Sequence, residues 1–173
     1  MLIDIQHLFL CLKGAKRMQI INDLRLIKHS FKAAIFSCYI ANKSKLSIKQ
    51  RKNIFIAGLL HDIGKVKLKK NILNKKEKLN GNEFEYIKQH VAFGVELLKK
   101  YKVPEEIYKI VEQHHERDDG TGYPKGLMES EISKEAKILR YADVYDALTS
   151  NRSYRKKYTK QKAIEIMIKE ELI

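Results

Sequence analysis

The sequence predicts an all-α, single-domain protein, and three observations support this fold class. Apolar residues recur at intervals of three and four along several windows, which is the spacing of one helix face. Alternating runs typical of strands do not occur in the sequence. The 173 residues suffice for one domain with a full core, and no repeat or linker divides them. We expect a helical lead-in over residues 1–23 and the domain over residues 24–173.

The composition is that of a globular protein, with 44% hydrophobic and 32% charged residues, and it excludes a disordered chain. The longest apolar stretches, such as residues 54–60, are far shorter than the roughly 20 residues that cross a bilayer. Asp4 stands where a secretory leader would have basic residues, so we expect a mature, cytoplasmic chain. Cys11 and Cys38 have apolar helical surroundings, and we expect buried thiols instead of a disulfide.

The formal net charge of +14 has two explanations. A positive surface field attracts polyanions such as nucleotides, nucleic acid or anionic membranes. Alternatively, the charge reflects lysines spread along the whole chain beside many isoleucines and asparagines, as in a proteome biased toward those codons. The even spread favours the second explanation, so we do not expect a nucleic-acid partner from charge alone.

The first helix of the domain is expected over residues 24–41, which are apolar nearly all round. Its charged residues Arg25, Lys28 and Lys32 are three and four positions apart, so they share one face. This pattern predicts a buried helix with one exposed edge.

Capping residues mark the next two expected helices. Ser47 has the properties of an N-cap for a helix that ends near His61. Asn82 and Glu85 have the spacing of a capping box. This pair predicts the start of a helix that continues to about Tyr101.

The C-terminal half contains one shaped loop between helices. Pro104 suits the first turn of a helix whose apolar stripe reaches His114. Residues 119–126 hold three of the eight glycines and one of the two prolines, which predicts a loop. Further helices are expected over residues 133–150 and from about Thr159.

His61 and Asp62 are adjacent at the end of an apolar helix, within the run His61-Asp62-Ile63-Gly64-Lys65. A carboxylate beside an imidazole offers one group that can bridge two cations and one that binds a single cation. A pair of this kind on its own is also a common helix-capping arrangement. The pair therefore needs further ligands before it indicates a metal site.

Two other histidines point inward from helices. His29 and His90 each have apolar residues three, four and seven positions away, so their rings face the core. Either one alone is consistent with a hydrogen-bonded core histidine. Two together indicate a shared polar centre, because buried imidazoles need partners.

The remaining candidates occur near the ends of later helices. His114 and His115 are consecutive, and both can reach one cluster only where their helix ends. Asp143 and Asp146 share one helix face with apolar residues, and a carboxylate there needs a cation, a cap or a hydrogen-bond donor.

Together these residues offer five imidazoles and two carboxylates as metal ligands: His29, His61, Asp62, His90, His114, His115 and Asp143. The mixture suits two divalent metals, with iron or manganese favoured and cobalt, nickel or zinc as alternatives. Such a centre lowers the pKa of a bound water and supports phosphoester hydrolysis.

Three long motifs, taken in order, resemble the HD-GYP domain, a bacterial branch of the HD phosphohydrolases. They are the runs of residues 61–65, 114–124 and 141–155, the second of which contains Gly122-Tyr123-Pro124. The resemblance extends from about Leu24 to the C-terminus. It implies a helical bundle around a metal centre that hydrolyses cyclic di-GMP to the linear dinucleotide and then to GMP.

The resemblance also implies roles for single residues. The five histidines with Asp62 and Asp143 match the family's metal ligands, and Asp62 bridges the metals. Lys65 matches a lysine beside the scissile phosphate, so Asp62 and Lys65 are the catalytic candidates. Tyr123 either lines the base site or packs structurally. The expected substrate contacts are Lys65, Gly122, Tyr123, Pro124, Asp146, Arg152 and Arg155.

Some positions depart from the family pattern. Members with three metals have a Glu one turn before the first histidine, where this chain has Arg25, and a cation there predicts two metals. Val91 and Ser153 replace frequent prolines, and neither is a ligand. The chain stops at Ile173, short of the usual last helix, and has no receiver or sensor domain ahead of it. We expect a truncated C-terminal end, a homodimer or a separate sensor partner.

The leading functional hypothesis is a cyclic di-GMP phosphodiesterase. Another cyclic dinucleotide such as cyclic GMP-AMP would require the same chemistry. Two other classes stay open, namely a general HD nucleotidase and a non-catalytic module that senses nucleotides or docks a partner. The complete ligand set favours the enzyme over the non-catalytic module.

Overall fold

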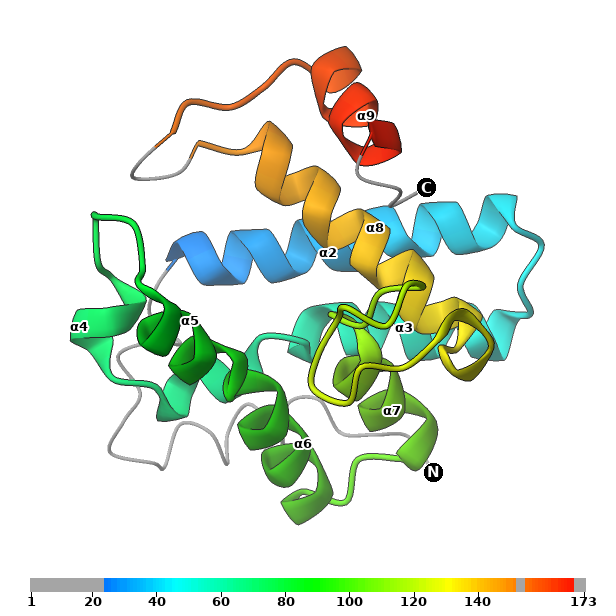
Figure 1. Ribbon diagram of the computed structural model, residues 1–173. Coiled ribbons are helices and arrows are strands. Elements are labelled where there is room, and N and C mark those ends of the chain that lie inside the picture. The colour runs from blue at the N-terminus through cyan, green and yellow to red at the C-terminus, as the bar shows by residue number, and fades with distance from the viewer. Residues whose placement is uncertain (1–23, 152–154, 170–173) are drawn as a thin grey trace.

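The computed structural model describes residues 24–151 and 155–169, except for the side chains of Leu24 and Arg25. All regular elements in these ranges are helices, and an isolated antiparallel bridge pairs Asp119 with Met128. The helices pack around one core (Figure 1). The all-α, single-domain prediction is confirmed.

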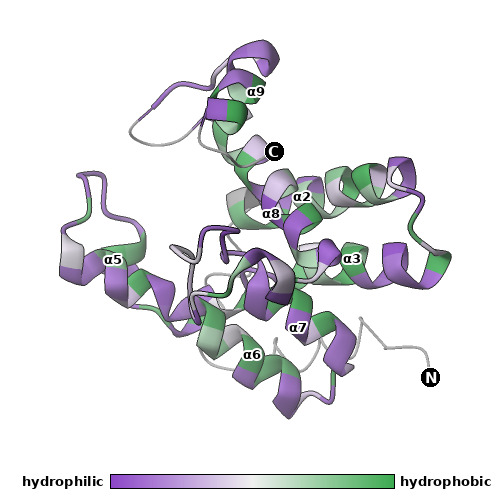
Figure 2. Ribbon diagram, turned by 45° about the vertical axis from the view of Figure 1, so that its right-hand side comes forward, coloured by the Kyte–Doolittle hydropathy of each residue, from purple (hydrophilic) through white to green (hydrophobic). Residues whose placement is uncertain are grey.

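The α-helices of the described ranges are α2 (Leu24–Lys43), α3 (Ile48–Leu60), α4 (Lys70–Leu73), α5 (Gly81–Lys88), α6 (His90–Lys100), α7 (Glu105–Gln113), α8 (Lys134–Thr149) and α9 (Lys160–Lys169). Two short 3-10 helices, η1 (Ile63–Lys67) and η2 (Glu129–Glu131), lie between them. The labelled helices carry both hydrophobic and hydrophilic residues (Figure 2). Helices such as α6 and α7 bury hydrophobic residues on one face and expose charged residues on the other, whereas α4 and α5 have no buried residue.

The helices α2 and α3 lie side by side, and α8 packs across α2 (Figure 1). The close approach of α2 and α3 depends on small residues. A Cβ added at Gly58 would lie 2.6 Å from the Cα of Ala34. On the other side of α3, α7 and α8 complete a core whose largest buried side chains include Ile54, Leu60, Ile107 and Leu139.

Two of the predicted helix starts are confirmed in the structure, and one predicted capping box was wrong. Ser47 caps α3 through a capping box with Gln50, and Ser133 caps α8. The capping box of α5, however, is formed by Asn80 and Glu83 instead of Asn82 and Glu85. Lys75 contacts both carboxylate oxygens of Glu83 at 2.7 Å, and this ion pair supports the earlier start.

The predicted helix from the capping box to Tyr101 is two helices, because the chain breaks at Gln89 between α5 and α6. The short elements α4, η1 and η2 were not predicted. Cys38 is a free cysteine and is half-buried, not buried as expected, and Cys11 lies outside the described residues. Within the described ranges, no helix has the length and apolar character that spanning a bilayer requires.

Replacing Gly58 with Ala is expected to lower the free energy of unfolding by about 1–3 kcal/mol, because the added methyl overlaps the α2 backbone. The measurement is equilibrium unfolding in urea. The matched control is Gly81→Ala, where an added Cβ meets no atom within 4 Å. The control should be neutral or stabilising, since Ala is the better helix former. Equal effects of the two changes would contradict the packing argument.

Candidate metal centre

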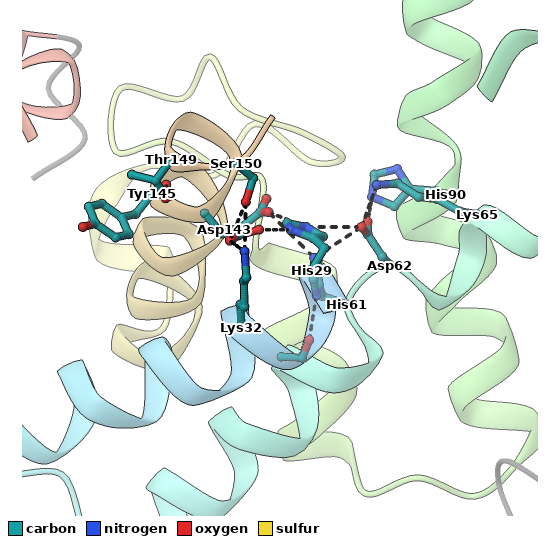
Figure 3. Close-up of polar contacts among 12 residues, drawn as sticks. His29, Lys32, His61, Asp62, Lys65, His90, Asp143, Tyr145, Thr149 and Ser150 are labelled. Carbon is teal, nitrogen blue, oxygen red and sulfur yellow. Dashed lines mark hydrogen bonds and ion pairs between the residues drawn. The ribbon is translucent and has the colours of Figure 1, made fainter. Parts of the chain in front are cut away.

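The structure brings the seven predicted ligands together from distant parts of the chain. His29 comes from α2, His61 and Asp62 follow α3, and Asp143 comes from α8 (Figure 3). Two sets of three side chains each offer ligand atoms that lie within 4.8 Å of one another inside the set, and we call these sets the first and second ligand groups. The first group is His29, His61 and Asp143, and the second is His90, His114 and His115. His61, Asp62 and His114 satisfy the same distance criterion and join the two groups.

Three of the histidines have a fixed tautomer. The Nδ1 atoms of His61 and His90 each lie 2.8 Å from the carbonyl oxygen three residues earlier, and that of His114 lies 2.6 Å away. A carbonyl oxygen only accepts, so each Nδ1 carries the proton and donates it. Each Nε2 atom then carries no proton and has a free lone pair. All three Nε2 atoms are buried and have no hydrogen-bond partner in the described structure.

The carboxylate of Asp62 faces both ligand groups. Its Oδ1 lies 3.6 Å from Nε2 of His90. Its Oδ2 lies 3.4 Å from Nε2 of His61 and 3.7 Å from Nε2 of His29. This side chain is therefore placed to share its two oxygens between two cations.

His29 lies between two carboxylates. Its Nδ1 is 2.7 Å from Oδ2 of Asp146, and its Nε2 is 3.0 Å from Oδ1 of Asp143. Burial alone would lower the pKa of His29, but these two contacts outweigh it and raise the pKa to about 9. Lys32 and Ser150 in turn contact Oδ1 of Asp146 at 3.3 Å and 3.0 Å (Figure 3). Asp146 is thus a partner that orients His29.

The other groups have the protonation states that a cation site requires. Burial lowers the pKa of His90, lowers that of His114 well below its usual value, and lowers that of His115 to about 3. Burial opposes ionisation of Asp62, yet the ammonium of Lys65 holds the pKa of that carboxyl well below its usual range. Neutral imidazoles with bare nitrogens beside ionised carboxylates are a donor set that fits divalent metals.

Gly64 fixes the distance between the His-Asp pair and α6. A Cβ at this position would overlap the carbonyl oxygen of His90 and lie 2.5 Å from the backbone nitrogen of Gly94. The missing side chain lets η1 pack directly against the start of α6. The sequence pattern alone assigned Gly64 no role, although a glycine two residues after a ligand is a signal of close backbone approach.

The loop after α7 is held against the centre. The ring of Tyr123 stacks on His115 with centroids 4.7 Å apart, and its backbone N–H donates to the carbonyl of His115 at 3.1 Å. Burial and the nearby carboxylate of Asp143 raise the pKa of Tyr123, so its phenol stays protonated. Gly122 packs so closely that a Cβ there would lie 2.5 Å from Cα of Glu116. Gly122 and Tyr123 thus lie beside the second group, whereas Pro124 is exposed.

Glu116 is a functional candidate that sequence reasoning missed. It is 1% exposed, and its carboxylate accepts hydrogen bonds from the backbone N–H groups of Lys125 and Leu127 at 2.7 Å and 2.9 Å. These bonds tie the loop to the residue that follows His115. The Glu was visible in the motif, but its partners became evident only with the loop in place.

The remaining predicted substrate contacts have different positions. Lys65 is partly exposed, and its Nζ contacts Oδ2 of Asp62 at 2.6 Å. The guanidinium of Arg155 donates to the carbonyls of Ala147 and Leu148 at 2.9 Å and 3.3 Å, so it satisfies the C-terminal end of α8. Arg152 lies outside the described residues.

Replacing Glu116 with Gln is expected to lower the free energy of unfolding by about 1–3 kcal/mol and to speed proteolysis within residues 119–127. The amide has one acceptor oxygen, so one buried N–H loses its partner. The matched control is Glu112→Gln, because Glu112 contacts the exposed end of Lys125 at 2.9 Å. Limited proteolysis with urea unfolding measures both variants. A Glu116 variant as resistant as the control would contradict the anchoring role.

Residues 16–172 match the HD domain family. The chain is 37% identical over 139 residues to the 3′3′-cGAMP-specific phosphodiesterase 3 of Vibrio cholerae. It is 38% identical over 140 residues to the cyclic di-GMP phosphodiesterase PA4108 of Pseudomonas aeruginosa. Each alignment covers 80% of this chain but only 30% and 34% of the relatives, so the chain spans about a third of their length.

Solved structures share the fold at lower identity. Bd1817, an HDG"Y"P protein from Bdellovibrio bacteriovorus, superposes with a TM-score of 0.70 at 22% identity, over 84% of this chain and 47% of that one. The HD domain of L. monocytogenes phosphodiesterase PgpH in complex with cyclic-di-AMP gives a TM-score of 0.67 at 20% identity, over 90% and 80%. The chain belongs to the HD domain family and carries the HD-GYP motifs that the sequence analysis identified.

Proposed function

We propose that this chain is a metal-dependent phosphodiesterase that opens a cyclic dinucleotide, with cyclic di-GMP as the leading substrate. The observation that carries the proposal is the pair of ligand groups that share the two oxygens of Asp62. Two cation positions beside each other suit phosphoester hydrolysis, in which an attacking and a leaving oxygen both need charge stabilisation. The names of the relatives support the substrate class.

The two ligand groups are proposed to hold one divalent metal each. His29, His61 and Asp143 would bind the first, His90, His114 and His115 the second, and Asp62 would bind both. Metals bound there would supply an activated water as nucleophile and neutralise charge on the phosphate. The mixed nitrogen and oxygen donors favour iron or manganese, with cobalt, nickel or zinc as alternatives. The count of two rests on Arg25, whose side chain lies outside the described residues.

Lys65 is proposed as the residue that stabilises the leaving oxygen. Its ammonium is 2.6 Å from Asp62, and its side chain is 22% exposed, so it borders both the ligands and solvent. Addition of water across one P–O bond opens the ring, and the alkoxide that leaves needs positive charge or a proton. Lys65 can provide this positive charge while its ion pair with Asp62 stays intact.

The second candidate substrate is 3′3′-cyclic GMP-AMP, because three of the relatives are named as phosphodiesterases for this compound. Both compounds contain the same phosphodiester ring, so the proposed chemistry is identical. The choice between them depends on contacts with the bases.

The wild-type protein loaded with Fe²⁺ or Mn²⁺ under anaerobic conditions is expected to convert cyclic di-GMP to the linear dinucleotide. Asp62→Asn should reduce the rate at least about 100-fold, because the neutral amide is a poor bridging ligand. Chromatography of the products and elemental analysis of the same preparation are the measurements. Fully metal-loaded wild type that opens neither cyclic dinucleotide would refute the proposed function.

Asp146→Asn tests whether this carboxylate orients His29 or contacts substrate. The variant removes the negative charge that contacts Nδ1 of His29. This loss is expected to weaken metal binding about 10- to 100-fold, which is typical when a partner of a metal ligand is changed. Chelator competition measures the metal affinity. Ser150→Ala is the matched control, because Ser150 contacts Asp146 but not His29. Unchanged metal affinity with a higher KM would instead assign Asp146 to the substrate.

A further inference from the structure

Phe84 on α5 is an exposed aromatic residue beside the metal centre. Its side chain is 46% exposed, and α5 has no buried residue, so Phe84 contributes little to the core. Single exposed apolar residues are ordinary on protein surfaces. Phe84 differs because its ring contacts Tyr123 of the GYP loop, with centroids 6.5 Å apart and planes at 81°.

A continuous series of rings connects Phe84 to the ligands. Tyr123 stacks on His115 at 4.7 Å, and His115 lies 5.2 Å from His90 in an edge contact. The series therefore starts among the buried histidines and ends on a ring that faces solvent. Phe84 is separated from the second ligand group by Tyr123 alone.

Lys88 connects the two outer rings. Its Nζ lies 5.1 Å from the ring centroid of Phe84 and 5.3 Å from that of Tyr123. An ion pair with Glu85 at 2.6 Å holds the ammonium in this position. Cation–π contacts with both rings stabilise their arrangement, and they add a positive charge beside an aromatic surface.

We infer that Phe84, Lys88 and Tyr123 form a nucleobase platform, on which one base of the dinucleotide stacks while its phosphate lies at the metal centre. The inference rests on the proposed function and names the residue that binds the base. Bases have flat π-surfaces that stack on aromatic side chains, and a neighbouring ammonium favours an anionic ligand with acceptor atoms on the base. Phe84 is the exposed end of the platform, so it is a substrate-binding residue and not a ligand of the metals.

The test compares Phe84→Ala with wild type in steady-state kinetics on cyclic di-GMP and in equilibrium dialysis of the same nucleotide. Loss of stacking is expected to raise KM and the dissociation constant about tenfold or more, with kcat changed less than about twofold. Metal content should be unchanged, because Phe84 contacts no ligand directly. Phe84→Trp should restore binding, since a larger aromatic surface stacks at least as well.

The control is Tyr39→Ala, which removes another exposed aromatic side chain, 57% exposed on α2, and should leave KM unchanged. A Phe84→Ala variant with wild-type KM and dialysis affinity would overturn the platform, even if the wild type is fully active. Dialysis keeps the two proposals separate. Binding that depends on Phe84, without turnover of either cyclic dinucleotide, would refute the phosphodiesterase and support the platform. A wild type that does not bind cyclic di-GMP would overturn the platform.

Discussion

Three hydrogen bonds from histidine Nδ1 atoms to backbone carbonyls determine how the centre is built. The accepting carbonyls belong to Gly58, Ile87 and Val111, each in the last turn of its helix. Carbonyls in the last turn have no partner within the helix. His61 and His114 directly follow their helices, and His90 is the first residue of α6. Each donates its Nδ1 proton to one of these carbonyls, and this bond directs Nε2 inward. The ligand nitrogens are thereby oriented by backbone, and the orientation does not depend on flexible side chains.

This construction has an energetic consequence. Buried lone pairs and carboxylates without partners destabilise a folded chain, because they lose water and gain nothing in return. In the described structure His29 partly compensates, since its raised pKa allows it to donate to Asp143 and Asp146 together. Divalent cations bound by the two ligand groups would satisfy the remaining nitrogens. Metal binding and fold stability are therefore expected to be linked.

Supporting contacts extend outward from the ligands in two directions. On one side, Asp146 holds His29 and is itself held by Lys32 and Ser150. On the other side, Glu116 anchors the loop that carries Tyr123 against His115. Both carboxylates act on a histidine of the centre without being predicted ligands. The centre is thus positioned by residues whose own partners lie far away in the sequence.

The sequence by itself determined the helical class, most helix boundaries and the candidate ligands, because helical periodicity and local motifs are properties of neighbouring residues. It also indicated that His114 and His115 could act together only at a helix end, and α7 does end at Gln113. Tertiary structure decided which oxygen of Asp62 faces which group, the partner of Asp146 and the anchoring role of Glu116. It also decided that Arg155 donates hydrogen bonds to the carbonyls at the C-terminal end of α8. These outcomes depend on distances between separate helices and loops, which local sequence patterns do not contain.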